Sequence, residues 1–477
     1  MTSVTGRLPE KKELDRALNS SNAELIVVYG RRRVGKTFLI REHLKSAIVF
    51  ELTGLHDEPL RRQLENFTLQ LRTRTRRNDE PAQSWLQAFA QLKEFVTSQT
   101  SGPKKCVLFF DEFPWLAGRR SGFLAAFEEF WNSGASRDPK IMCVICGSAA
   151  SWMISKVINT KGGLHNRATA RIRLEPFSLC ETKEYLQHRR IRLNDFQIAQ
   201  LYMTVGGVPH YLQRIQPGKS AVQNIDELCF AKDGLLTNEF SNLYRALFDN
   251  SEQHEAVVRA LAAKRQGLTR SELADAAGLK SGGTLSKVIT DLTESGFIRA
   301  MPALYASRKN ALLRLVDEYT LFYLCWIENN RMHGDNIWLT KSSGQKWKSW
   351  CGYAFENLCL KHIHQIKHAL GISGVLTEEA SWHSRPATKG ESGAQIDLVI
   401  DRNDQCINVC EMKFTEGDFV IDKRYATELT RKLAVFRAGT QTRKSLFLTM
   451  VTSNPIRQNE YAQQLVANQV TLDELFR

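Results

Sequence analysis

The chain has 477 residues, of which 43% are hydrophobic and 24% are charged, and its formal net charge is +14. This composition excludes a disordered protein, and the length favours about three domains over a single core. The positive charge favours an acidic partner, nucleic acid above all. No apolar run is long enough to span a bilayer and the first residues lack a signal peptide's apolar segment, so we expect a cytoplasmic protein without membrane contact.

Cysteines and basic clusters leave simpler interpretations open. Cys143 and Cys146 have C-x-x-C spacing inside an apolar, strand-like run, and no second pair completes a zinc site. We therefore expect buried, reduced thiols. Basic residues bunch at 31–33, 72–77 and 189–192, where each cluster either contacts an acidic partner or forms a solvated face.

A glycine-bounded loop lies between the apolar run 25–29 and a segment of helical spacing, 38–44. It reads Gly30-Arg31-Arg32-Arg33-Val34-Gly35-Lys36-Thr37, the pattern G-x-x-x-x-G-K-T. Gly30 and Gly35 let backbone N–H groups approach phosphate oxygens, and the helix that follows adds its positive dipole end. Lys36 would reach the β- and γ-phosphates, and Thr37 would offer a hydroxyl to Mg²⁺. The sequence therefore predicts a P-loop that binds ATP and Mg²⁺.

Two further apolar runs end in polar residues suited to the same chemistry. The run 106–110 ends in Asp111, which would hold Mg²⁺, and Glu112, which would polarise the attacking water. The run 141–146 ends in Gly147 and Ser148, and Ser148 is our candidate sensor of the γ-phosphate. Arg167 precedes the strand-like residues 170–174; it either stabilises transition-state charge, in cis or in trans, or is an ordinary surface arginine.

These motifs, with Pro176-Phe177 and Gly206-Gly207-Val208-Pro209, resemble the prokaryotic ATPase family of the AAA+/STAND group, which is most abundant in archaea. The resemblance covers roughly residues 5–245. It implies an ATP-hydrolysing α/β core with a helical lid, followed by a winged helix and a C-terminal domain similar to restriction endonucleases. Relatives of this kind often complete the site with a neighbour's arginine, so a homo-oligomer is left open.

Residues 253–300 fit a helix-turn-helix with a wing. Helices are predicted at 255–263, 268–274 and 281–295, followed by the start of a strand at Gly296. The third helix would present Lys280, Thr284 and Lys287 to a major groove, or the whole element only packs against the lid. Aromatic residues in 312–340 recur at helical spacing, which predicts a buried helical connector.

A second chemical centre is predicted after residue 345. The helix 345–370 carries Glu356, and the strands 394–401 and 407–413 carry three more polar residues, Asp397, Glu411 and Lys413. A helix at 420–438 and a strand at 446–451 complete the order α-β-β-β-α-β. Side chains alternate along a strand, so Glu411 and Lys413 share a face that Asp397 can join. Asp397 and Glu411 would coordinate Mg²⁺, Lys413 would position the water, and Glu356 would extend the metal shell.

Ile396-Asp397 and Glu411-Met412-Lys413 resemble the PD-(D/E)xK nuclease superfamily, with Ile396 in place of the proline. A structural salt bridge is the alternative. On the preceding helix, His364 and His368 have the i,i+4 spacing of zinc-binding pairs. No third ligand lies nearby, so core or surface histidines are favoured there.

The predicted fold class is α/β, with a P-loop parallel-sheet core, a helical lid, a winged helix and a restriction-endonuclease-like domain. The predicted domains are 1–180, 181–250, 251–315, 316–344 and 345–477. The predicted function couples ATP hydrolysis to Mg²⁺-dependent cleavage of nucleic acid, with DNA expected and RNA left open. The alternatives are a regulatory ATPase that binds DNA or a partner without cutting, and a nucleotide-gated DNA-binding module. A scaffold without chemistry would leave both centres unexplained.

Overall fold

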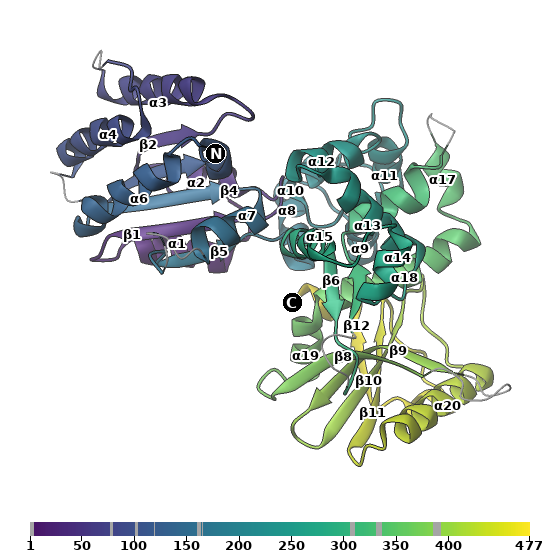
Figure 1. Cartoon of the computed structure of the whole chain (residues 1–477). Helices are drawn as coiled ribbons and strands as arrows, with labels where there is room; N and C mark the ends of the chain where they lie inside the picture. The colour runs from purple at the N-terminus through teal and green to yellow at the C-terminus, as the bar shows by residue number, and fades with distance from the viewer. Residues whose placement is uncertain are drawn as a thin grey trace. The chain divides into compact units, whose positions relative to one another are not determined.

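The computed structural model describes residues 4–76, 80–100, 104–118, 120–159, 164, 166–305, 311–330, 336–384 and 393–477. They form two compact units: Met1–Pro176 with Arg245–Asp249, and Phe177–Tyr244 with Asn250–Arg477. Figure 1 labels the elements of each unit. Both units combine helices with a five-stranded sheet, which confirms the α/β fold class.

The first unit is built on a parallel sheet in the order β2-β3-β4-β1-β5. Its strands are β1 (Glu24–Tyr29), β2 (Ile48–Thr53), β3 (Cys106–Asp111), β4 (Ile141–Gly147) and β5 (Ala170–Arg173). Four of them, β1, β3, β4 and β5, lie at the apolar or strand-like runs singled out in the sequence. Because β4 lies between β1 and β3, the segments that follow these three strands meet at one edge of the sheet.

Helices cover both faces of this sheet, which explains why its strands are continuous apolar runs. The helices are α1 (Leu8–Leu18), α2 (Lys36–His43), α3 (Leu60–Thr75), α4 (Trp85–Gln99), α5 (Phe113–Leu116), α6 (Phe123–Ser133) and α7 (Ala150–Met153), with short helical turns η1 (Ala135–Arg137) and η2 (Ile154–Ile158). Leu25 and Val27 face a core shared with α3, α4 and α6, whereas Ile26 and Val28 face α1 and α2. Alternate residues of β1 therefore serve two cores.

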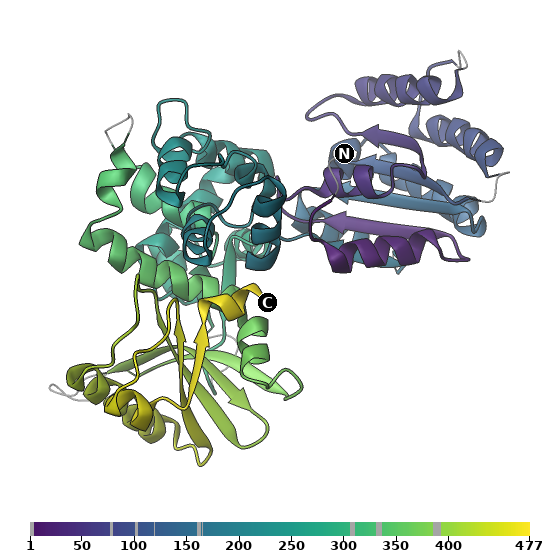
Figure 2. The ribbon, with the colours of Figure 1, turned by 180° about the vertical axis from the view of Figure 1, so that it is seen from behind.

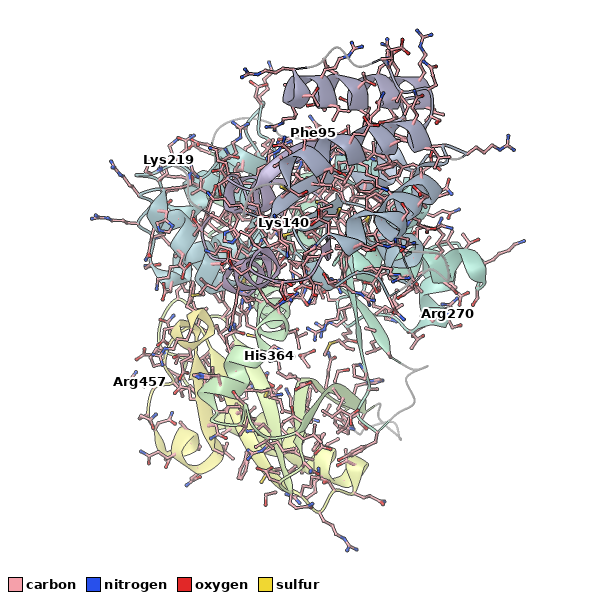
Figure 3. All side chains as sticks on the ribbon, turned by 90° about the vertical axis from the view of Figure 1, so that its left-hand side faces the viewer. Phe95, Lys140, Lys219, Arg270, His364 and Arg457 are labelled. Carbon is pink, nitrogen blue, oxygen red and sulfur yellow. The ribbon has the colours of Figure 1, made fainter. Side chains whose placement is uncertain are left out.

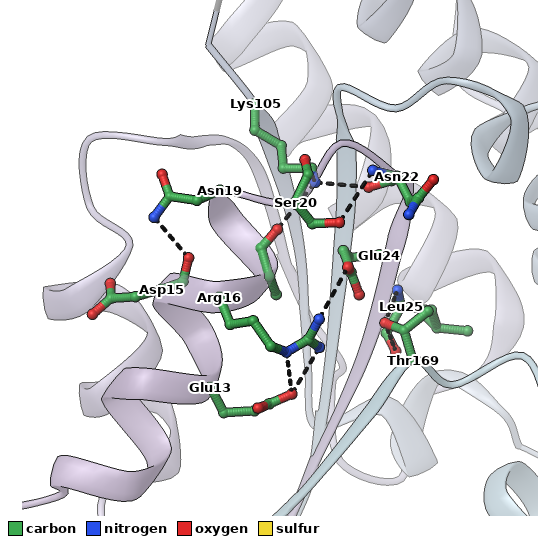
Figure 4. A network of polar contacts seen from close by, with 11 residues as sticks. Glu13, Asp15, Arg16, Asn19, Ser20, Asn22, Glu24, Leu25, Lys105 and Thr169 are labelled. Atoms are coloured by element: carbon green, nitrogen blue, oxygen red, sulfur yellow. Dashed lines mark hydrogen bonds and ion pairs between the residues drawn. The ribbon is translucent and has the colours of Figure 1, made fainter.

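A buried lysine connects the start of the chain to the sheet. The Nζ atom of Lys105, just before β3, donates to the backbone oxygens of Ala17, Ser20 and Asn22 at 3.0, 2.8 and 2.7 Å. Arg16 of α1 is paired with Glu24 of β1 at 3.6 Å, as Figure 4 shows. These contacts hold α1 against the strand that precedes the glycine-bounded loop.

The first part of the second unit is helical, as predicted for residues 195–247. Its helices are α8 (Leu179–His188), α9 (Asp195–Val205), α10 (Pro209–Leu212), α11 (Ala221–Cys229), α12 (Glu239–Leu247), α13 (Ser251–Ala263), α14 (Arg270–Ala276) and α15 (Gly283–Glu294). Capping boxes begin α8, α11 and α14 at Ser178, Ser220 and Thr269.

The helices α13 to α15 are followed by an antiparallel hairpin of β6 (Ile298–Met301) and β7 (Leu312–Leu315). The prediction that residues 312–340 are helical throughout is therefore wrong at its start, because Leu312–Leu315 pair with β6. Helical segments follow: α16 (Glu318–Phe322), η4 (Tyr323–Ile327) and α17 (Ile337–Lys341). Their aromatic side chains are packed together, and Trp338 is fully buried.

The remaining residues form a mixed sheet in the order β12-β11-β10-β9-β8. Its elements are α18 (Gln345–Lys361), α19 (Ile363–Ala369), β8 (Thr377–Ser384), β9 (Ala394–Arg402), β10 (Cys406–Lys413), α20 (Lys423–Thr440), β11 (Ser445–Thr452), α21 (Glu460–Leu465), β12 (Asn468–Thr471) and η5 (Leu472–Phe476). The expected order α-β-β-β-α-β is followed by α21 and β12, which were not predicted. One predicted helix, 345–370, is divided at His362.

The edges of this sheet are covered differently. At β8, the backbone of Ser381 exchanges hydrogen bonds of 3.0 Å with Pro302 and Leu304, which follow β6. At the other edge, the chain ends in η5 beside α19, as both ribbon views show (Figures 1 and 2). Within the described residues, no helix has the length and apolar character needed to cross a membrane.

Candidate functional sites

The glycine-bounded loop has the backbone conformation that its two glycines predicted. Gly30 has a φ of +149°, and a Cβ atom there would lie 2.2 Å from the carbonyl oxygen of Leu174, so no side chain fits. Gly35 has a φ of +90° and caps the N-terminus of α2. Backbone N–H groups and the start of α2 thus face the same place, as a phosphate site requires.

Lys36 is almost fully buried, with 5% of its surface exposed. Its Nζ atom donates to the backbone oxygens of Gly30 and Arg31 at 3.0 and 2.9 Å, and to Ser148 Oγ at 3.1 Å. Burial lowers the pKa of the Lys36 ammonium group. The side chain is therefore held across the loop by neutral oxygens, which phosphate oxygens can replace.

The acidic pair after β3 joins the loop to β4. Thr37 Oγ1 donates to Asp111 Oδ2 at 2.8 Å. Glu112 has a left-handed backbone, with a φ of +45°, and its Oε1 accepts a hydrogen bond from Ser148 Oγ at 2.8 Å. Side-chain hydrogen bonds thus connect the segments at the ends of β1, β3 and β4. They run from Thr37 to Asp111 and from Glu112 through Ser148 to Lys36.

These residues fit ATP and Mg²⁺ in shape and chemistry. The loop leaves no room for a side chain at Gly30, as expected where a backbone curls round a phosphate. Thr37 and Asp111, already within hydrogen-bonding distance, are the oxygen donors that Mg²⁺ takes in P-loop proteins. Lys36 would bind the phosphates, and Glu112 would lie next to them with its orientation set by Ser148.

The other loop residues take different positions, and one contact was not predicted. Arg31 and Val34 are buried, whereas Arg32 and Arg33 are half-buried. The Val34 carbonyl accepts a hydrogen bond of 3.2 Å from Arg7, a buried residue at the start of α1. Arg7 therefore supports the loop through the Val34 backbone. Arg7 was not predicted as a site residue. In the sequence it stands out only as a charged residue just before an amphipathic helix.

Arg167 lies in the segment before β5, and its side chain is exposed. Among the described residues, it makes no side-chain hydrogen bond or ion pair with the loop or the acidic pair. Its role as a transition-state residue stays a prediction.

The second centre lies where β9 and β10 run side by side. Their antiparallel pairing ends at Cys410 and Leu398, and Glu411 and Asp397 are the next residues along the two strands. Lys413 Nζ lies 3.1 Å from Glu411 Oε1. The structure therefore joins Glu411 and Lys413 directly. That Asp397 shares their face stays a prediction.

Glu411 has two more partners, both on α20. Lys432 Nζ lies 2.7 Å from its Oε2, and the Tyr425 hydroxyl donates to its Oε1 at 2.8 Å. Burial alone would raise the pKa of Glu411, but the charges of Lys413 and Lys432 outweigh it and lower this pKa. The sequence contained a signal for both partners: Tyr425 and Lys432 repeat with Leu429 and Phe436 on the buried face of α20.

Asp397 and Glu356 share a different cation, Arg314 of β7. Its Nη1 lies 3.5 Å from Asp397 Oδ1 and its Nη2 lies 3.4 Å from Glu356 Oε2. Gln395 also donates to Asp397 Oδ1 at 2.9 Å. Burial, and then the charge of Asp397, raise the pKa of Glu356. Arg314 was not predicted as a site residue. The available signal was its charge, which is unusual inside an apolar strand such as Leu312–Leu315.

The donor chemistry of this centre suits Mg²⁺, which commonly takes one or two carboxylates and fills its other positions with water and phosphate oxygens. Asp397 and Glu411 are such a pair. Across the described ranges, no three His, Cys, Asp or Glu side chains are gathered closely enough to form a metal site by themselves. Glu356 as a further ligand stays a prediction, because its carboxylate is joined to Arg314.

The histidines and cysteines that the sequence singled out differ in burial. His362 is buried; its Nε2 accepts a hydrogen bond of 3.1 Å from the Leu179 N–H, and its Nδ1 lies 2.8 Å from the Leu358 oxygen. His364 is exposed on α19, as labelled in Figure 3, and so is His368. Cys143 and Cys146 are buried free thiols whose pKa burial raises. Their positions agree with core or surface histidines and buried thiols, and the absence of a zinc site stays a prediction.

Comparisons with known proteins address the first unit most directly. Residues 5–215 match the family described as an ATPase domain predominantly from Archaea. An uncharacterised protein of Methanocaldococcus jannaschii, MJECL04, is 22% identical over 430 residues, which are 89% of this chain and 91% of that protein. An uncharacterised ATP-binding protein of the same organism, MJ0423, is 50% identical over 40 residues, 8% of this chain and 68% of that protein.

Among solved structures, the Walker-type ATPase PABY2304 of Pyrococcus abyssi is similar, with 17% identity and a TM-score of 0.47. The match covers 67% of this chain and 96% of that chain.

Proposed function

We propose that this chain, whose residues 5–215 are an archaeal-type ATPase domain, uses its nucleotide state to control Mg²⁺-dependent cleavage of nucleic acid. The observation that carries the proposal is the pairing of Glu411 with Lys413 on β10, beside the strand β9 that carries Asp397, in a chain that also has a P-loop. The net charge of +14 favours a nucleic acid as the partner, and DNA is the expected substrate.

In the first unit, Mg²⁺ bound with ATP would neutralise charge on the γ-phosphate and orient it for attack by water. Lys36 would exchange the oxygens of Gly30 and Arg31 for phosphate oxygens. Glu112 would accept the proton of the attacking water, held in place by its hydrogen bond from Ser148. Ser148 also contacts Lys36, so it would report the presence of the γ-phosphate to both residues.

In the second unit, a Mg²⁺ ion at Asp397 and Glu411 would supply an activated water and polarise the phosphodiester. Lys413 would offset the negative charge that develops on the phosphate, while its own position is fixed by Glu411. Lys432 and Tyr425 would orient the Glu411 carboxylate.

Binding of DNA would involve the helices α13 to α15, read as a winged helix. Lys280, Thr284 and Lys287 are all exposed at or on α15. Arg270, labelled in Figure 3, donates to Ser286 Oγ at 2.7 Å and so links α14 to α15. An exposed Arg167 is compatible with a homo-oligomer in which one copy completes the nucleotide site of the next.

The test is cleavage of plasmid and of single-stranded DNA with Mg²⁺, with and without ATP, by the native chain, Asp397→Ala and Lys36→Ala. Cutting that is lost in Asp397→Ala and altered in Lys36→Ala supports an ATPase-controlled nuclease. ATP turnover without cutting by the native chain rejects it. Repeating the assay with RNA of the same sequence decides which nucleic acid is the substrate.

A regulatory ATPase that binds nucleic acid without cleaving it is the second candidate. The observation that favours it is that every acid of the second centre is already paired with a cation: Arg314 for Glu356 and Asp397, and Lys432 for Glu411. This candidate predicts that Asp397→Ala leaves nucleic-acid affinity and ATP turnover unchanged.

A further inference from the structure

Arg314 reaches the acidic centre from outside the C-terminal sheet. It lies on β7, directly opposite Arg299 of β6. Its side chain is 2% exposed, and its two terminal nitrogens contact acids from two other elements, Glu356 of α18 and Asp397 of β9. One guanidinium group therefore serves two of the carboxylates that we assign to the nuclease centre.

This guanidinium lies between two neighbouring carboxylates, Glu356 and Asp397, whose side chains are 26% and 25% exposed. Arginine stays protonated at any pH of interest, so its charge is permanent. Without it, Glu356 and Asp397 would repel each other where water screens poorly. The contacts of 3.4 and 3.5 Å are long for ion pairs with arginine. A divalent ion that binds carboxylate oxygens at about 2.1 Å competes well with bonds of that length.

The hairpin that carries Arg314 is fixed to the domain whose acids it contacts. The Leu304 N–H donates to the Ser381 carbonyl, and the Ser381 N–H donates to the Pro302 carbonyl, both at 3.0 Å. Asn357, one residue after Glu356, donates to the Leu315 carbonyl at 3.3 Å. A change in the position of the hairpin would therefore be transmitted to Arg314.

Arg314 also has space to leave the acids. It lines a cavity of about 670 Å³ together with Asp397 and with other residues of β7, β8 and β9. Its other walls include Lys264, Thr269 and Gln395. A guanidinium that swings into this cavity would stay among polar groups and water, so its displacement needs no unfolding.

We propose that Arg314 is the resident cation of the acidic centre, which a divalent metal must displace from Asp397, so that the hairpin β6–β7 sets the metal affinity of this centre. The inference rests on the proposed nuclease function, since it takes Asp397 and Glu411 as the metal ligands. Arg314 acts here as a positioning residue.

The experiment measures Mn²⁺ binding to the full chain, from the electron paramagnetic resonance signal of the free ion, without nucleotide or nucleic acid. All proteins carry Asp111→Asn, which removes the carboxylate among the two metal ligands proposed for the nucleotide centre, Thr37 and Asp111. We expect Arg314→Gln to bind Mn²⁺ at least about tenfold more tightly than the reference protein. Arg299→Gln, the matched control on the partner strand, should bind as the reference does. Unchanged or weaker binding by a folded Arg314→Gln protein overturns the inference.

Loss of a buried cation can also unfold the protein, which circular dichroism melting would reveal. In that case Arg314→Lys carries the test, because a lysine keeps the charge but cannot bridge two acids with one planar group. We expect this variant to bind Mn²⁺ about three- to tenfold more tightly, and unchanged affinity overturns the inference.

Asp397→Asn separates this inference from the proposed function. If Asp397→Asn binds Mn²⁺ as well as the reference, the metal site itself is wrong and the nuclease proposal fails. If Asp397→Asn loses binding while the Arg314 variants bind as the reference does, only the displacement inference fails.

Discussion

The two centres satisfy their charged groups in opposite ways. In the first, the buried Lys36 is held by backbone oxygens and a serine hydroxyl, all neutral. In the second, three acids are held by three cations, Arg314, Lys413 and Lys432. A cation among neutral acceptors is ready for an anion, whereas acids paired with cations must exchange partners before they bind a metal. The difference suggests that ligand binding is direct at the first centre and competitive at the second.

The largest expected effect would break the first centre without touching the second. Glu112→Gln removes the proton acceptor but keeps the size of the side chain and a hydrogen-bond partner for Ser148. We expect ATP turnover to fall by about 10²- to 10⁴-fold, with ATP binding retained. Turnover and binding of a fluorescent ATP analogue give the two readings.

Glu129→Gln, an exposed change on α6, is the control for Glu112→Gln. A Glu112→Gln protein that turns over ATP at the native rate would contradict the assignment of the base.

The second prediction concerns how the stability of the second unit depends on pH, through a buried histidine at the end of the helix that carries Glu356. Burial lowers the pKa of His362, where α18 ends, to about 4 against an ordinary 6.5. Between these values the unfolded chain takes up a proton that the folded chain does not, so the free energy of unfolding falls as pH falls. The loss is up to about 3 kcal/mol between pH 6.5 and pH 4. Urea denaturation at a series of pH values measures it.

In His362→Gln, the part of the pH dependence of the free energy of unfolding that this histidine contributes should disappear. His364→Gln, on the exposed side of α19, should leave the slope as it is. Identical pH profiles for the native chain and His362→Gln would show that the buried histidine is not the cause.

The third prediction sharpens the contrast in charge pairing. Lys432→Met removes one of the two cations that pair with Glu411 among the described residues and leaves Lys413. We expect a loss of about 2 kcal/mol in the free energy of unfolding, below the range for fully buried pairs because both side chains are 13% exposed. Lys423→Met on the exposed side of α20 is the control, and equal stability of the two variants would contradict the prediction.

The smallest expected effect concerns binding rather than either centre. Lys287→Ala on α15 should reduce DNA affinity modestly and lower the slope of log affinity against log salt by about one. Fluorescence anisotropy with a labelled duplex at several salt concentrations measures this slope. Glu294→Ala at the other end of α15 serves as the control, and an unchanged slope in Lys287→Ala would remove this residue from the DNA-binding surface.

Local patterns allowed much of the first unit to be predicted. The loop Gly30–Thr37 and the acids at the end of β3 are contiguous motifs, and their residue types are typical of phosphate and Mg²⁺ binding. Apolar runs indicate the buried parallel strands. The alternation of β10 likewise placed Glu411 and Lys413 on one face. In contrast, Arg7 and Arg314 meet their partners only through folding: Arg7 contacts a residue 27 positions away, and Arg314 contacts one 83 positions away. Sequence periodicity contains no information about such pairs.

The strand β7 and the break at His362 were missed for a related reason. Aromatic residues after Leu315 have helical spacing, and this pattern was extended over Leu312–Leu315, whose pairing with β6 is a non-local interaction. Likewise, the helix ends at Lys361 because the buried ring of His362 accepts a hydrogen bond from Leu179, far earlier in the chain. Tertiary contacts therefore override local helix propensity at both places.

The pairing of Ser381 with Pro302 and Leu304 has a practical consequence for dissecting the protein. A chain shortened to residues 345–477 would expose the outer backbone of β8 as an unprotected sheet edge, which invites intermolecular strand addition and aggregation. A fragment beginning near residue 250 keeps the segment that covers this edge. Insolubility of the shorter fragment beside solubility of the longer one would identify residues 302–304 as an intramolecular safeguard against self-association.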